Sequence, residues 1–234
     1  MRKIFLLSAA AFFILSSTFG NSLNANQPTE RQTSGYNNNL NFRLAIDGGL
    51  GVRLAEAAEP VDYTRHLKCG FVGNAEAIYF ISDTWGVGAM GNIFKTSYSQ
   101  GSLSDNIAFW FIGPTLSERA IIYSRKTRAP QCAVYANTSL GLLSYKDKGS
   151  FLDEDYKTVY ATVTGKTIGV GFSLDFDYYI NENFAIGLQA RTILGGLSKV
   201  VYTLASGTYE VTLPDDQQES LSHLDIGLGV RWNL

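Results

Sequence analysis

The sequence predicts an all-β protein, an eight-stranded antiparallel up-and-down transmembrane β-barrel. Three observations lead to this fold class. Apolar side chains alternate with small or charged ones over eight segments, the small face is rich in glycine, and the connections alternate between short and long. Because successive side chains of a strand point to opposite faces, a period of two residues indicates strands with one apolar face.

The composition fits a β-rich chain that is short of charge. Of the 234 residues, 45% are hydrophobic, 13% aromatic and 17% charged, against roughly 25% charged in an average globular protein. The mean hydropathy of -0.01 excludes a helical membrane protein, and the apolar and aromatic content excludes a wholly disordered chain. The net charge of -2 provides no basic surface for nucleic acid.

The N-terminus has the parts of a secretory signal peptide. The basic pair Arg2-Lys3 precedes an apolar run over 4–15 and a small-residue exit. The run is shorter than the ~20 apolar residues that span a bilayer, which argues against a membrane anchor. Cleavage is expected after Gly20, so that residues 1–20 are removed, with Ala25 as an alternative.

The predicted barrel domain occupies residues 40–234 and follows a flexible polar leader, residues 21–39, rich in Asn and Gln. Four of its segments alternate cleanly and four more weakly, and each can supply the ~9–11 residues of a tilted spanning strand. Pro114 lies in a weaker segment and predicts a bulge or a weakly paired position. In chain order the segments are 42–54, 67–81, 85–97, 107–119, 132–145, 167–178, 186–194 and 224–234.

The chemistry of the two faces indicates which one is inside. A soluble barrel would place Lys, Glu and Thr on its polar face, whereas here that face is mostly glycine with scattered Arg and Asp. Such a face suits the narrow interior of eight strands, where glycine leaves room for a few opposed charges. The apolar face is then expected to contact lipid, in which only a closed sheet leaves no unpaired edge.

Loop lengths give an independent test. Tight connections are expected at residues 82–84 and 181–183, and long ones at 147–165 and 198–221. Short periplasmic turns and long external loops are typical of outer-membrane barrels. The connection over residues 120–131 falls on the side of the barrel where short turns are expected, and its length has no explanation in this scheme.

Aromatic residues gather beside the tight turns and at the C-terminus. Phe80 and Tyr179 belong to these groups, which are expected to lie at the periplasmic rim as an interfacial girdle. The alternative is ordinary strand aromatics in a soluble core. The girdle residues singled out are Tyr79, Trp85, Tyr178, Phe184 and Trp232.

Cys69 and Cys132 are the two cysteines of the chain. A disulfide is the first expectation for an exported protein. The strand assignment, however, places them on different strands near opposite ends, which favours two unpaired thiols. The chain has no cysteine spacing typical of a metal site, and no cofactor is expected.

The last strand resembles the C-terminal assembly signal of bacterial outer-membrane barrels. The residues that carry this likeness are Asp225, Gly227, Val230, Trp232 and Leu234, with Leu234 at the end and the aromatic residue two positions earlier. Together with the segments 71–74, 85–88 and 111–115, the chain resembles the small eight-stranded outer-membrane proteins of the porin family, OmpX- or OmpW-like. This resemblance implies residence in a Gram-negative outer membrane, contact with its lipid, and dependence on the barrel assembly machinery.

Charged residues on the inward face form the candidate functional site. One hypothesis is a charged constriction of a pore that selects ions. The favoured one is an internal plug, because buried charges must be paired and eight strands enclose a space that side chains just fill. The residues are Arg43, Asp47, Arg53, Lys68, Glu76, Asp175, Asp177, Arg191, Asp225 and Arg231.

Catalysis is not expected. Some eight-stranded barrels modify lipid A with a surface His, a Ser and an acid, but neither His66 nor His223 has such a neighbourhood. Ser222 and His223 are consecutive on one strand and point to opposite faces, so they cannot converge with Asp225.

The expected function is therefore structural or interactive, carried by the external loops of a monomer. Residues 200–204 and 208–213 predict a hairpin beyond the membrane, Val200–Leu213, which could bind an extracellular partner by strand addition. A ten-stranded barrel that includes this hairpin is a weaker possibility. A pore for small solutes is the alternative function, and a lipid A-modifying enzyme the second alternative.

Overall fold

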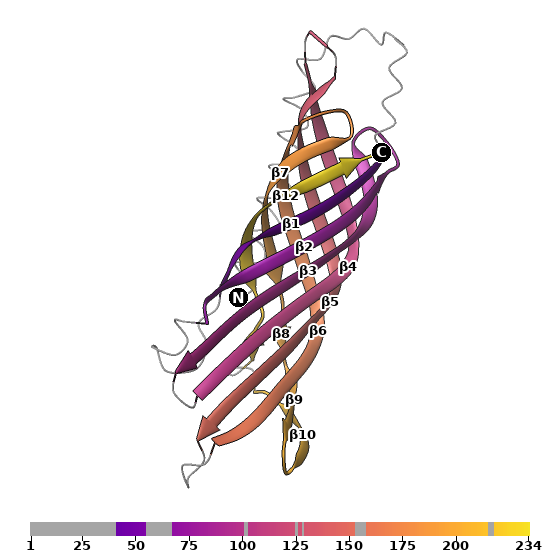
Figure 1. The fold of residues 1–234 in the computed structure, drawn as a ribbon. Coiled ribbons are helices and arrows are strands. Elements are labelled where there is room, and N and C mark those ends of the chain that lie inside the picture. Colours follow the sequence, from indigo (N-terminus) through magenta and orange to yellow (C-terminus); the bar gives the residue numbers. More distant parts are fainter. Residues whose placement is uncertain are drawn as a thin grey trace. The chain divides into compact units, whose positions relative to one another are not determined.

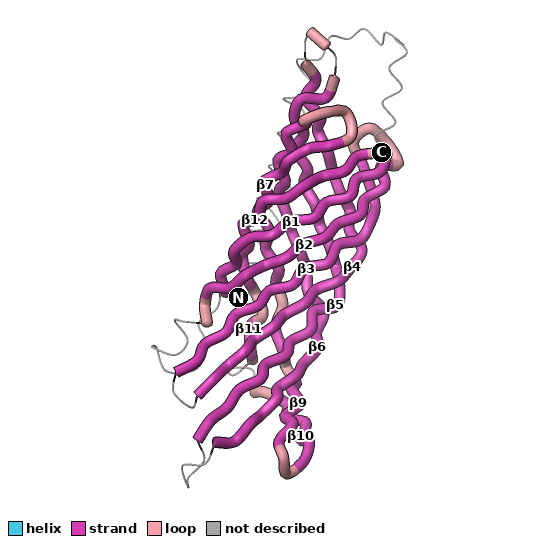
Figure 2. The backbone as a smooth tube through the Cα atoms, viewed as in Figure 1, coloured by secondary structure: helices cyan, strands magenta, loops and turns pink. Residues whose placement is uncertain are grey.

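The computed structural model describes residues 41–54, 67–100, 103–124, 126–127, 129–152, 158–214 and 218–234. The predicted signal peptide and polar leader, and also His66, lie outside these residues. Within them the chain is almost entirely strand, connected by turns (Figure 1; Figure 2). No helix among the described residues is long and apolar enough to cross a membrane.

Eight antiparallel strands close into a ring, which confirms the predicted fold class. Each strand pairs with the next along the chain up to β7, and the last strand, β12, lies between β7 and β1. The ring strands are β1 (Phe42–Arg53), β2 (Cys69–Phe80), β3 (Trp85–Gln100), β4 (Leu103–Tyr123), β5 (Pro130–Leu152), β6 (Thr158–Tyr179), β7 (Phe184–Leu194) and β12 (His223–Asn233).

The seam that closes the ring joins β1 to β12 in continuous register. Glycines let the two backbones approach closely there. A Cβ at Gly49 would lie 2.0 Å from the carbonyl oxygen of Ile226, a contact that no side chain can make. Gly48, one residue earlier, has nothing within 4 Å of such a Cβ because it faces outward. Glycine is thus a packing requirement on one face of the seam.

An apolar belt covers the outside of the ring. On β12 and the C-terminus, every second residue from Leu224 to Leu234 is apolar and exposed, with exposed fractions of 42–65%. Ten residue steps of ~3.3 Å, tilted by ~40°, give a height of about 25 Å, the usual height of the apolar band on outer-membrane barrels. The outward face is therefore matched to hydrocarbon.

The ring is much taller on one side than on the other. β3 to β6 have 16–23 residues, whereas β1, β2, β7 and β12 have 11–12. The four long strands extend past the rest of the barrel (Figure 1). The expected loop over residues 147–165 is wrong, because β5 and β6 continue to pair up to Leu152 and Thr158. Beyond the apolar belt the outward face of a strand does not need to be apolar. Strand pairing therefore continues where the alternation of apolar and polar residues stops.

The predicted external hairpin is present but lies outside the ring. It consists of β9 (Lys199–Leu204) and β10 (Gly207–Thr212), and β9 pairs with β6 where β7 has ended. The short strands β8 (Gly196–Leu197) and β11 (Glu219–Ser220) form a separate ladder. The barrel is thus eight-stranded, and the ten-stranded alternative is wrong.

Two irregular places are now explained. Half of the segment 120–131 is strand, since β4 runs to Tyr123 and β5 begins at Pro130, and the Ser124 N–H donates to the Ala129 carbonyl at 2.9 Å between them. Pro114 produces a gap in pairing rather than a bulge: the β4–β5 register is the same on both sides of Gly113 and Pro114, which have no partners on β5. The register shift in this pair of strands lies instead between Ile122 and Tyr123.

Candidate functional site

The inside of the barrel holds a charged layer between two apolar clusters. Inward side chains of β2 show this sequence of layers along one strand: Val72 is apolar, Asn74 and Glu76 are polar, and Ile78 and Phe80 are apolar again. The cluster at the turn side also contains Ala133, Tyr135, Tyr179 and Ala185, and the larger cluster at the other end includes Met90, Phe94, Ile107, Phe109, Phe111, Leu143 and Ile193.

Nine of the ten charged residues expected in the lumen are buried there, each at most 6% exposed. Lys68 is the exception, because it precedes the first residue of β2 and its side chain is exposed at the rim. The other nine come from β6, β7, β12, β1 and β2, which are five consecutive strands of the ring. They are Arg43, Asp47, Arg53, Glu76, Asp175, Asp177, Arg191, Asp225 and Arg231.

Arg43 is the centre of the charged layer. Its guanidinium donates to three carboxylates: Nη1 to Glu76 at 3.0 Å, Nη2 to Asp175 at 3.1 Å and Nε to Asp177 at 3.0 Å. Its Cζ lies 4.1 Å from the centre of the Tyr135 ring, so the cation is also covered by an aromatic face. One side chain of β1 thereby links β2 to β6 across the lumen.

Two further arginines complete the pairing. Arg191 of β7 forms an ion pair with Glu76. Arg231 of β12 donates from Nε to Asp177 at 3.1 Å, and its Nη2 lies 2.6 Å from Asp47. Glu76 and Asp177 therefore each contact two guanidiniums. Such shared, charge-assisted contacts are what permits charges to be buried at this depth.

Neutral amides extend the layer toward the large apolar cluster. Nδ2 of Asn92 donates to Asn74 and to Asp225, both at 2.7 Å, and its Oδ1 lies 3.1 Å from Nε2 of His223. Nη1 of Arg191 donates to Asn74 at 2.9 Å. A search of the sequence for charges misses these residues, although Asn74 and Asn92 occupy inward positions of their alternating strands.

The layering determines what the lumen can do. A conducting pore needs a continuous polar path, but stacked Phe94 and Phe109, with ring centres 5.2 Å apart, lie on one side of the charged layer. On the other side Tyr135 hydrogen-bonds Tyr179 at 3.1 Å, and Phe80 packs against Tyr135. This arrangement favours the plug over the charged constriction.

A second polar group lies beyond the belt, at the end of the barrel away from the tight turns. The hydroxyl of Tyr145 donates to Asp147 at 3.1 Å, and Arg53 forms an ion pair with Glu219. Burial, together with a hydrogen bond to the Asp105 carboxyl, raises the pKa of Asp147 well above its ordinary value of 3.8.

No catalytic constellation is formed by the described histidine. His223 and Asp225 share the inward face, with Nε2 and Oδ2 3.7 Å apart, but the Ser222 hydroxyl is directed to the backbone of Gly195. The expected divergence of Ser222 from His223 is thus what the structure shows. Among the described residues, no three His, Cys, Asp or Glu side chains are grouped as metal ligands.

All five girdle residues face outward beside the tight turns or at the C-terminal end, with exposed fractions of 45–53%. Phe184 and Trp232 stack with ring centres 6.0 Å apart. Phe80 and Tyr179 do not belong to the girdle, because their positions have the opposite parity and their side chains are buried in the turn-side cluster.

The C-terminal residues and the cysteines take the following places. Asp225 lies in the charged layer, Gly227 and Val230 pair with β1, and Trp232 and Leu234 face outward. Cys69 and Cys132 are both free.

The hairpin leaves one strand edge unpaired among the described residues, because β10 pairs with β9 alone. The turn Ala205-Ser206 has two residues, so Leu204 and Gly207 form a hydrogen-bonded pair. Non-hydrogen-bonded and hydrogen-bonded pairs then alternate along the hairpin, beginning with the non-hydrogen-bonded pair of Thr203 and Thr208. The N–H groups of Thr208, Glu210 and Thr212 therefore point away from β9. The hydrogen bond from the Leu213 N–H to the Ser198 carbonyl, at 2.8 Å, falls on a pair that this alternation predicts to be hydrogen-bonded.

Comparisons with known proteins support the fold and not a particular family. No family model and no curated protein sequence matches this chain. A major outer membrane protein from Thermus thermophilus is similar in structure, with TM-score 0.50, 11% identity and coverage of 82% of this chain and 99% of that one. Ail of Yersinia pestis, solved with the heparin analogue sucrose octasulfate, has TM-score 0.46 and 13% identity, covering 82% and 99%. Neisserial surface protein A has TM-score 0.44 and 13% identity, covering 82% and 97%.

Proposed function

We propose that the protein is a non-catalytic outer-membrane barrel that binds an extended segment of an extracellular partner at the free edge of β10. The tight turns and the C-terminus face the periplasm, and the tall half of the barrel projects outside the cell. The apolar belt and the aromatic girdle support residence in the membrane. The paired charges between two apolar clusters support a lumen that does not conduct.

The free edge of β10 is the observation that carries this proposal. Three outward N–H groups in a strand of six residues offer a ready template for another strand. The strand is rich in residues that favour β-structure and contains no proline, the usual protection of an edge. Tyr209 and Val211, with exposed fractions of 51% and 40%, could contact alternate side chains of the added strand.

The remaining partners follow from where the last strand lies. β12 both closes the ring against β1 and carries the residues that resemble an assembly signal. We infer that the assembly machinery engages this strand before β1 pairs with it. The outward face of β12 is apolar along its length, so its neighbour in the membrane is lipid, and the barrel acts as a monomer.

A matched pair of edge variants tests the proposal. Thr208→Pro removes one outward N–H without removing a bond to β9, whereas Thr208→Val keeps the N–H and changes the side chain. Labelled vesicles that carry each protein are applied to an array of secreted and extracellular-matrix proteins. Every interaction seen with the wild type is expected to weaken at least tenfold in Thr208→Pro and to persist in Thr208→Val. Interactions that survive Thr208→Pro would place the binding surface elsewhere.

A further inference from the structure

We propose that the outward face of β3–β6 binds one phosphorylated, multiply acylated lipid of the outer leaflet, with its phosphates on Lys95, Lys146 and Lys166 and an acyl chain in a groove beside Pro114. The inference uses the membrane residence of the proposed function but not the β10 edge. It combines two features of one face, an apolar groove and a row of lysines.

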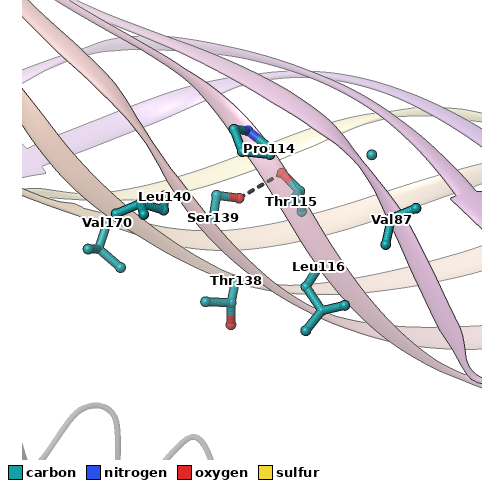
Figure 3. Close-up of a pocket in the computed structure, with 9 residues that line it drawn as sticks. Val87, Pro114, Thr115, Leu116, Thr138, Ser139, Leu140 and Val170 are labelled. Atoms are coloured by element: carbon teal, nitrogen blue, oxygen red, sulfur yellow. Dashed lines mark hydrogen bonds between the residues drawn. The ribbon is translucent and has the colours of Figure 1, made fainter.

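The groove lies on the lipid-facing side of β3 to β6. It has a volume of about 400 Å³, and its outward walls are Val87, Pro114, Leu116, Thr138, Leu140 and Val170 (Figure 3). Its lining is thus mostly aliphatic, as an acyl chain requires.

The ladder behind the groove is interrupted at two glycines, which occupy inward positions of β4 and β5. Gly113 faces Gly141 across the gap in pairing, and a Cβ on either would lie 2.4 or 2.2 Å from a carbonyl oxygen of the opposite strand. Behind the sheet, the hydroxyls of Thr115 and Ser139 are hydrogen-bonded at 2.7 Å (Figure 3). These two inward hydroxyls are therefore paired with each other, and Thr138 is the one outward wall residue with a polar side chain.

The three lysines lie close to one line across the same strands. Ala108 of β4 faces Lys95 of β3 on one side and Lys146 of β5 on the other. Lys146 faces Thr164 of β6, and Lys166 is two residues further along that strand. All three lysines are exposed, and none of the ion pairs found among the described residues uses them.

The surroundings of the row complement phosphate. Trp110 is exposed on β4 beside it, where an indole is typical of the membrane interface. No described outward-facing residue of β3–β6 at or just above this level is acidic. These neighbours are Ser97, Asn106, Lys148, Thr162 and Thr164. Glu210 of β10 continues the same row beyond Thr164 and Val201, but its carboxylate forms an ion pair with Lys199 at 3.5 Å.

The separation of row and groove matches a lipid. Leu140 at the groove and Lys146 in the row are six residues apart on β5, about 20 Å along a strand and about 15 Å along the membrane normal after a tilt of ~40°. Half of the apolar belt of about 25 Å is about 13 Å, so the two lengths agree to within about one residue step. Lysines at headgroup level therefore place Leu140 near the bilayer centre, where an acyl chain ends, and from there the groove extends toward the turn-side girdle, since Val87 is two residues from Trp85.

The test uses the full-length purified barrel in detergent, titrated with bisphosphorylated lipid A and read by native mass spectrometry. The probe lipids are bisphosphorylated and dephosphorylated lipid A, and inorganic pyrophosphate is the competitor. The variants are the triple substitution K95Q/K146Q/K166Q, the groove-filling Thr138→Phe, and the control K68Q/K126Q on exposed lysines elsewhere. A change in gel mobility on heating verifies that each variant is folded.

One cation near an anionic lipid surface changes affinity about fivefold. The triple variant is therefore expected to bind bisphosphorylated lipid A at least tenfold more weakly, and Thr138→Phe severalfold more weakly. The wild type should bind the dephosphorylated lipid at least tenfold more weakly, and the control should stay within twofold of wild type.

The inference is overturned if the triple variant keeps wild-type affinity or if dephosphorylated lipid A binds equally well. Displacement of the lipid by pyrophosphate would likewise show that the lysines bind free phosphate, and an unchanged Thr138→Phe would remove the groove. None of these results bears on the Thr208→Pro experiment, so the two proposals fail separately.

Discussion

Replacement of Arg43 by Met tests whether the charged layer holds the barrel together. Met keeps most of the buried length of the side chain and removes the guanidinium that donates to Glu76, Asp175 and Asp177. Removing one member of a buried ion pair costs about 3–5 kcal/mol, because the remaining charge is left without compensation.

The structure indicates that this cost is incurred once and not three times. Glu76 keeps its ion pair with Arg191, and Asp177 keeps the Nε donor of Arg231. Asp175 loses its guanidinium, and among the described residues it keeps a hydrogen bond from Asn137 at 3.2 Å. The expected loss in free energy of unfolding is therefore about 3–5 kcal/mol, dominated by Asp175.

A second substitution separates this account from simple loss of packing. In Arg43→Met/Asp175→Asn the orphaned charge is gone, so the double variant should regain about half or more of the lost stability. Arg43→Lys keeps the charge but not the three-way donor geometry and should fall between wild type and Arg43→Met. Folding is measured by urea titration of the barrel in lipid vesicles, followed by tryptophan fluorescence and gel mobility.

The reasoning is refuted if Arg43→Met costs less than ~1 kcal/mol, the range of solvent-exposed pairs. It is also refuted if the double variant is no more stable than Arg43→Met. The first result would mean that the layer is hydrated enough to screen the charges, and the second that the guanidinium acts by packing on Tyr135.

Two other substitutions test the seam and the external polar group. Gly49→Ala should prevent barrel closure because its Cβ would meet backbone at 2.0 Å, while Gly48→Ala should assemble normally; equal yields of heat-modifiable barrel would contradict this. Since burial and Asp105 raise the pKa of Asp147, the native state binds a proton that the unfolded chain releases above its ordinary pKa of 3.8. Stability should therefore fall as pH rises from about 4, and urea midpoints across pH should show a smaller slope in Asp147→Asn; an identical slope would exclude Asp147 as its source.

The sequence predicts the barrel well where each strand crosses lipid, because there one face must be apolar and the other must fit a narrow lumen. β1 and β12 end within about one residue of the predicted segments for this reason. It predicts the long strands poorly. β6 begins at Thr158 and not near residue 167, because its first residues are exposed or half-buried and neither face carries a continuous apolar pattern.

The sequence predicts which residues belong to the charged site but not which of them form ion pairs with each other. Alternation places Arg43, Asp175 and Asp177 on inward faces, yet β1 and β6 are separated by more than a hundred residues and meet only through the curvature of the ring. Which carboxylate meets which guanidinium depends on shear and side-chain length. Lys68 shows the limit of parity alone, since it has the inward parity of β2 but precedes the strand and is exposed.

The slanted rim makes an exposed sheet edge unavoidable and accounts for the position of the hairpin. A barrel abolishes edges only where all its strands have the same height. Here β7 ends at Leu194 while β6 continues, and β9 takes the place of β7 by pairing Val201 with Thr164 and Thr203 with Thr162. The edge is thereby transferred from β6 to β10, at the outermost part of the molecule and away from the membrane. The additional height of β3–β6 is therefore not required for spanning the belt, and it is what gives the proposed partner site on β10 its unpaired edge.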